Sequence, residues 1–347
     1  MRRITLLFGL AAFLVPLSAF AHEGDSGHGP AASGSGSVST EGAAGPEHAE
    51  GAEPEEKEPD WEASLDFVGG LTTMDVLNEG RPTRIELPPQ NIFDSTRVTT
   101  LSFVPALERH FGPKLTVGLR IPIIDGELRS RTGAADPRTV LMAGNLELEG
   151  SYKFLARKNL DVFGVLEIAL PTAGGAEPPT PDQVAETPTK SFDYQKIDRW
   201  ATARGASFAR GAFDSALFEP GRIGIIPKVT ATLKAVGGKL EVKPTVKVEN
   251  LIDVTGDAAQ GYLGEFVGGV RVGYLVVPHV QPALSGWVSA TFTSTDEKDT
   301  TFVVVEPAVK FPFERVAPEV GVIVPMPVGH LWDDKTWGLR LAIAGEF

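Results

Sequence analysis

Charged side chains recur at every second position in several segments of this chain. In residues 144–154, GNLELEGSYKF, Glu147 and Glu149 alternate with leucines. Residues two apart lie on the same face of a β-strand, so such charges converge on one surface, where they can stabilise ions and polar solutes or pair with one another. The residues predicted to share that surface are Arg120, Glu147, Glu167, Lys228, Lys243, Lys247, Glu249, Glu265, Arg271, Glu306, Lys310 and Arg340.

Acid–base or metal chemistry would need further residue types that the sequence does not bring together. A general base of the histidine kind must lie beside a nucleophile, but His110 and His279 fall in expected short turns and His330 in an expected loop. The chain has no cysteine, and it contains no phosphate loop, zinc motif or dinucleotide fingerprint. The sequence therefore predicts no catalytic residue, no cofactor and no metal site.

The elements that must position these charges are strands with a period of two residues. In the last segment, Trp337, Leu339, Leu341 and Ile343 share one face, and Arg340 lies on the other. In the fourth segment we assign Val140 and Met142 to the same apolar face as the later leucines. Twelve such segments are predicted, at about 61–71, 97–107, 114–124, 139–154, 159–170, 222–235, 239–250, 263–277, 280–293, 301–313, 316–328 and 335–347.

The start of the chain differs from the rest. Residues 1–21 hold two arginines, an apolar run and the tripeptide AFA, a pattern typical of a secretory signal peptide. Residues 22–60 contain ten acidic residues against one lysine, almost no large apolar residue, and histidines too far apart to form a ligand motif. Such a segment cannot bury enough apolar area to fold. We predict an exported protein with a disordered acidic tail before the strands.

The connections between the segments favour a membrane barrel over a soluble sheet protein. Short and long links alternate along residues 61–347, and the strand count is even. This rhythm is typical of outer-membrane barrels, in which short turns face the periplasm and long loops face outward. Basic residues left in lipid near the midplane would each cost roughly 2 to 4 kcal/mol, so the charged face must line the lumen. The predicted fold is all-β, a single twelve-stranded antiparallel transmembrane barrel.

Two features decide what such a lumen could do. Twelve strands lie between the eight that side chains can fill and the sixteen to eighteen of wide channels. The lumen is therefore a narrow polar pore, which we favour, or a plug of ion pairs. The long loop 171–219 offers Arg199, Trp200, Arg204 and Arg210 as a constriction that would meet wall carboxylates. Alternatively, this loop forms a cap on the rim or contacts lipopolysaccharide.

Several strand phrases resemble a known family. VGLRIPI (117–123), GNLELEGSYKF (144–154), LEIALPTAGG (166–175) and VIVPMPVG (322–329) are similar to strands of proteobacterial outer-membrane transporters encoded with aromatic-degradation pathways. The likeness departs from the family pattern at Ala173, which precedes the glycine. The resemblance implies a barrel fold and a transport role, and it transfers neither a substrate nor a functional residue.

The expected function is a narrow outer-membrane pore or transporter for small hydrophilic or amphipathic solutes. The alternative is a closed structural, adhesive or ligand-binding barrel that acts through its outer loops. We expect the acidic tail and the C-terminus to face the periplasm. Expected partners are outer-membrane lipid, lipopolysaccharide, a small solute and the assembly machinery that would recognise Phe347, with no nucleic acid.

Overall fold

A computed structural model describes residues 60–74, 96–130, 136–176, 194–254, 261–292, 301–328 and 336–347. The signal peptide, all but the last residue of the acidic tail, and His330 lie outside these described residues. Within the described ranges, no helix is both long enough and apolar enough to cross a membrane.

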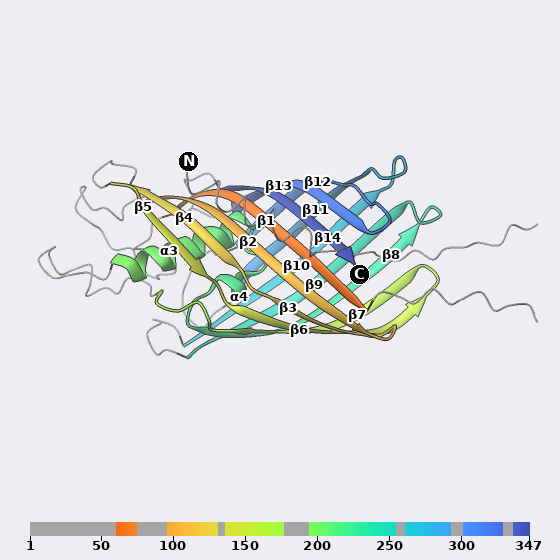
Figure 1. Cartoon of the computed structure of the whole chain (residues 1–347), viewed down its shortest axis with the longest axis horizontal. Coiled ribbons are helices and arrows are strands. Elements are labelled where there is room, and N and C mark those ends of the chain that lie inside the picture. Colours follow the sequence, from red (N-terminus) through yellow and green to blue (C-terminus); the bar gives the residue numbers. More distant parts are fainter. Residues whose placement is uncertain are drawn as a thin grey trace, which may run out of the picture.

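The strands form one closed antiparallel barrel (Figure 1). Each strand pairs with its neighbour in sequence, and β1 closes the ring by pairing with both β14 and β2. Segments β3 and β4 form one strand along β2, and β5 and β6 form the next, so the fourteen segments make twelve strands. This confirms the predicted fold class. The strands are β1 Trp61–Met74, β2 Thr96–Phe111, β3 Leu115–Arg120, β4 Ile123–Ser130, β5 Arg138–Ala143, β6 Leu146–Arg157, β7 Leu160–Leu170, β8 Arg222–Ala235, β9 Leu240–Asp253, β10 Tyr262–Tyr274, β11 Gln281–Phe292, β12 Thr301–Lys310, β13 Val316–Val328 and β14 Trp337–Glu346.

The two ends of the barrel differ in their connections. At one end, which we call the short-turn end, the links run from residues 158–159 at the shortest to 275–280 at the longest. Both the start of β1 and Phe347 lie at this end, where the Phe347 amide donates to the Trp61 carbonyl over 3.0 Å. The opposite end, the long-loop end, carries the remaining connections, including residues 171–221 between β7 and β8.

The two faces of the barrel wall differ in chemistry. Outward side chains are apolar and exposed, for example Leu119 at 39%, Val270 at 43% and Leu339 at 50%. Their strand neighbours Arg120, Arg271 and Arg340 point inward and pair with carboxylates. An apolar outer face and a charged inner face suit a wall surrounded by lipid.

One strand changes its facing where β5 meets β6. Val140 and Met142 pack inside the barrel, so their assignment to the outward face was wrong. The register of β5 on β4 and that of β6 on β3 differ by one residue across Gly144 and Asn145. Such a bulge moves every side chain before it to the opposite face. The residues after it keep the predicted facing, with Glu147 inside and Leu148 outside.

Two helices lie inside the barrel rather than above it. Helix α3, Tyr194–Ala209, runs within the ring of strands at the long-loop end, and α4, Ser215–Phe218, follows it deeper in the lumen (Figure 1). Helix α3 contacts β1, β2, β4, β5, β13 and β14. We call residues 194–219 the plug. It occupies the long-loop end of the lumen, where we favoured a narrow pore over a plug of ion pairs.

Candidate functional site in the barrel lumen

The plug fits closely because the wall beneath it lacks side chains at the contact points. A Cβ on Gly338 of β14 would lie 2.2 Å from the carbonyl oxygen of Ala209. A Cβ on Gly70 of β1 would lie 2.2 Å from the Cβ of Ala209. On the other flank, a Cβ on Gly126 of β4 would lie 2.4 Å from Thr202. Contacts this short leave no room for any other residue. The wall and the plug are therefore fitted to each other.

Apolar side chains fill the remaining space around α3. Phe208 is 2% exposed and packs against Phe302 of β12 with ring centroids 5.3 Å apart. Trp200, which we had placed at a constriction, is buried in the same cluster. Wall residues that face the lumen at this level, such as Val98 and Val304, are fully buried. This part of the lumen is a dry core of the kind found in soluble proteins.

Charged groups attach both ends of the plug. Asp198 on α3 accepts from Arg138 of β5 through both carboxylate oxygens, over 2.7 and 2.9 Å. Arg210, after α3, pairs with Asp66 of β1. Arg204 pairs with Glu219 within the plug, and Arg199 donates to the Gly174 carbonyl.

The bulge in the wall also attaches the plug. The Asn145 amide donates to the carbonyls of Ala216 and Glu219 over 2.8 and 2.7 Å, and its oxygen accepts from the Ala173 amide. The adjacent Thr172 hydroxyl donates to the Gly144 carbonyl over 3.0 Å. Two phrases that carried the family resemblance, one containing Asn145 and one containing Thr172, thus meet at α4.

Asp214 lies in the turn between the two helices and faces the wall. Its carboxylate is 3.3 Å from the Lys247 ammonium and 3.9 Å from the Arg120 guanidinium. Burial raises the pKa of the Asp214 carboxyl, but Lys247, Arg120 and Arg210 together outweigh burial and hold the pKa well below its ordinary value. Asp214 therefore stays ionised and links the plug to β9.

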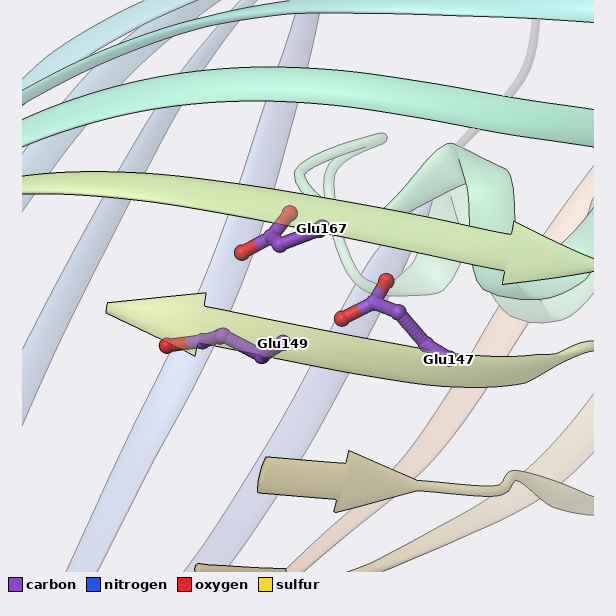
Figure 2. Close-up of side chains that lie close together, drawn as sticks. All are labelled: Glu147, Glu149 and Glu167. Carbon is purple, nitrogen blue, oxygen red and sulfur yellow. The ribbon is translucent and has the colours of Figure 1, made fainter. Parts of the chain in front are cut away.

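Three carboxylates lie close together on the inner wall near this turn. Figure 2 shows Glu147 and Glu149 on β6 and Glu167 on the neighbouring strand β7. One oxygen of each lies within 4.8 Å of the others, a spacing that could hold a metal ion. However, Arg120 donates to Glu147 over 2.7 Å, and Lys228 pairs with Glu167 and Glu149. Because these two cations already pair with all three carboxylates, the cluster is part of the ion-pair network of the wall.

A second group of ion pairs lines the opposite wall. Arg340 of β14 donates to Asp66 over 3.0 Å and to Glu306 of β12 over 3.1 Å. Arg271 of β10 donates to both oxygens of Glu319, over 2.9 and 2.6 Å. Pairing of this kind offsets part of the cost of removing these charges from water.

Between these two groups lies a cavity of about 390 Å³. The plug forms its end through Arg210, Phe213 and Asp214. Beyond the cavity toward the short-turn end, inner-wall side chains are partly exposed, including Lys153 at 27% and Asp161 at 36%. The cavity therefore belongs to the wet part of the lumen and ends at the plug.

The residues predicted to line a pore all lie on the inner face of the wall, in three settings. Arg120, Lys228, Lys243, Arg271, Glu306 and Arg340 reach the cavity. Glu147, Glu167, Lys247, Glu249 and Glu265 are buried beside it or against the plug, and Lys310 is half-buried near the short-turn end. Among the predicted constriction residues, Arg210 alone borders the cavity, and the wall carboxylate with which it pairs belongs to Asp66.

Sequence reasoning missed several residues that matter to this site. Asp66 and Asp214 each meet two cations or more, and Asn145 holds α4 to the wall. Asp66 carried a usable signal, because it is an acidic residue on the lumen-facing parity of the first strand. Asp214 and Asn145 carried no signal for their contacts. Asp214 reaches Lys247, and Asn145 reaches the Ala216 carbonyl, only in the folded chain.

Comparison with known proteins identifies the fold. No protein-family model and no curated protein matches the chain. Among solved structures, an outer membrane channel from Pseudomonas putida F1 is similar with a TM-score of 0.53 and 12% identity, over 85% of this chain and 100% of that one. The chain therefore has the fold of an outer-membrane β-barrel channel, as the resemblance implied.

Two further structures are more distant. The NanC porin has a TM-score of 0.43 and 8% identity, over 82% of this chain and 100% of the porin. The transport unit of the autotransporter AIDA-I from Escherichia coli has a TM-score of 0.44 and 10% identity, over 85% and 91%. At these TM-scores the likeness says nothing further about this chain.

Proposed function

We propose that this protein is an outer-membrane channel for small hydrophilic or amphipathic solutes, and that the plug closes it in the conformation described. The observation that carries the proposal is the charged cavity of about 390 Å³ whose end is the plug itself. A barrel with a purely structural role would have no need of a polar chamber that ends at a separately folded segment.

The short-turn end faces the periplasm under this proposal. Short periplasmic turns and long outer loops are the rule in outer-membrane barrels. Phe347, half exposed at the short-turn end, is then available to the assembly machinery as the barrel forms. The acidic tail before β1 starts from the same end. A solute in the cavity is in contact with the periplasmic side until the plug moves.

A second candidate is a permanently closed barrel that acts through its outer loops. The dry packing around α3 favours it, because Phe208 and its neighbours form a core that does not need to open. The two candidates predict different recordings from the full-length barrel, since only a channel opens while its plug is present.

Deletion of residues 178–215, joined by a short glycine–serine linker, tests the proposal. This deletion keeps Ala216 and Glu219, whose carbonyls bond to Asn145, so the wall stays closed at the bulge. Reconstituted in a planar bilayer, the deletion variant should conduct steadily and with a larger unit current than the full-length barrel.

The control for this experiment is assembly. The variant must migrate faster on a gel when unheated than when boiled, as folded barrels do. A variant that assembles by this criterion and still passes no current would reject the channel and favour the closed barrel.

A further inference from the structure

Basic side chains lie directly opposite each other at two places on the inner wall. Lys228 of β8 faces Lys247 of β9, and further toward the short-turn end Lys243 of β9 faces Arg271 of β10. Like-charged residues in this position destabilise a sheet unless other charges intervene. Each of these two basic pairs therefore requires anionic groups nearby.

Carboxylates surround the first basic pair. The Lys247 ammonium is 2.7 Å from Glu249 and 3.3 Å from Asp214, and Lys228 pairs with Glu167. One of these carboxylates, Asp214, comes from the plug rather than from the wall. A carboxylate that enters from the lumen thus completes the charge balance of this pair.

The second basic pair faces the cavity instead of the plug. Arg271 is held by Glu319 at 2.6 Å, and the Lys243 ammonium is 3.5 Å from Glu241. Both basic side chains also line the cavity, next to the Ser285 hydroxyl on the strand beside Arg271. The first pair thus has Asp214 of the plug beside it, whereas the second pair borders the cavity.

The cavity surface as a whole presents more cations than anions. Its basic lining residues are Arg120, Arg210, Lys228, Lys243, Arg271 and Arg340, and its acidic ones are Asp66, Asp214 and Glu306. Carboxylates that balance them, such as Glu147 and Glu167, lie behind in the wall and are 1% exposed. Because Coulomb energy falls with distance, a solute in the cavity interacts first with the cations.

We infer that the cavity binds a small organic carboxylate, whose anionic group lies between Lys243 and Arg271 where Asp214 lies in the equivalent basic pair. The carbon body of the ligand faces the plug end of the cavity, which Phe213, Trp287 and Ile323 line. The cavity volume is within the usual range for small-ligand sites. This inference rests on the proposed function, because it names the class of solute that the channel takes.

Binding to the full-length barrel in detergent tests the inference without any measurement of current. Succinate, followed by isothermal titration calorimetry, should bind the wild-type protein, and its neutral diamide should not. Lys243→Gln should weaken succinate binding about tenfold, because it removes one charge-assisted hydrogen bond. Lys234→Gln is the matched control, because Lys234 lies on the inner face of β8 but does not line the cavity.

The outcomes separate this inference from the proposed function. Equal affinity of the two variants for succinate, or no binding by the wild-type protein, would overturn the carboxylate site even if the barrel conducts. Succinate binding that depends on Lys243 in a barrel that never conducts would keep the site and reject the channel.

Discussion

The two halves of the lumen differ in what fills the inside of the barrel. Toward the long-loop end, α3 fills the barrel with apolar side chains, and wall glycines such as Gly70 let it approach the backbone. Toward the short-turn end, ion pairs such as Arg271–Glu319 border a cavity. A barrel interior can thus be dry and packed at one level and charged and wet at the next, and Asp214 and Arg210 lie where the two meet.

The sharpest contrast should come from the same substitution made in each half. Thr202 on α3 is 0% exposed and packs against Gly126, so Thr202→Glu buries a charge in the dry core and should cost at least about 3 kcal/mol. Thr230→Glu enters the cavity, where basic residues outnumber acidic ones, and should cost less than about 1 kcal/mol. Urea unfolding followed by tryptophan fluorescence measures both. Equal losses would mean that the two halves do not differ in hydration.

A side chain added beneath the plug should have the next largest effect. Gly338→Val places atoms where the Ala209 carbonyl lies and should destabilise the packed plug by about 1 to 3 kcal/mol. Bilayer recordings should then show more frequent openings. Gly150→Val is the control, because nothing lies within 4 Å of a Cβ at Gly150. An unchanged recording for Gly338→Val would indicate that the plug tolerates displacement without opening.

Loss of the amide that holds α4 should have a smaller, local effect. Asn145→Ala removes hydrogen bonds to Ala216 and Glu219 and should destabilise α4 by about 1 to 2 kcal/mol. Hydrogen exchange at the α4 amides should accelerate. Asn250→Ala loses a comparable bond, from its side chain to the Ile225 carbonyl, on an exposed surface and should leave α4 unchanged. Faster exchange in both variants would assign the effect to the barrel as a whole.

The smallest expected effect is that of mild acid on the plug. The pKa of Asp214 is lowered on folding, so its contribution is fully present above its unfolded value and is lost only as pH falls toward the folded value. The part of the opening frequency that depends on Asp214, measured as the difference between the wild-type protein and Asp214→Asn, should therefore stay constant from about pH 8 to about pH 5. A rise within this interval that Asp214→Asn abolishes would show that the carboxyl titrates there.

The barrel could be predicted because its signals are local. Alternating side chains and the alternation of short and long links are both properties of neighbouring residues, and they fixed twelve strands and their facing. The facing failed only at Val140 and Met142, because the bulge at Gly144–Asn145 changes the face without disturbing the alternation of even-numbered apolar residues.

The plug could be predicted only in part. Loop 171–219 stood out by its length and its arginines, but its alanines and glycines were the better signal, because small residues such as Ala209 allow a helix to lie against the wall. The wall partners of the plug could not be predicted from the sequence. Arg210 and Asp66 are 144 positions apart, and no local pattern links them.

The central claim is that the plug closes the lumen, and a disulfide between plug and wall tests it most directly. A Cβ on Gly205 of α3 would lie 3.2 Å from the Cβ of Val98 on β2, close to the separation of roughly 3.5 to 4.5 Å in disulfides. The chain has no other cysteine, so the pair Val98→Cys and Gly205→Cys would react only with itself. Single-channel recording should show no openings when the pair is oxidised and wild-type openings after reduction. Openings that persist in the oxidised protein would contradict the claim.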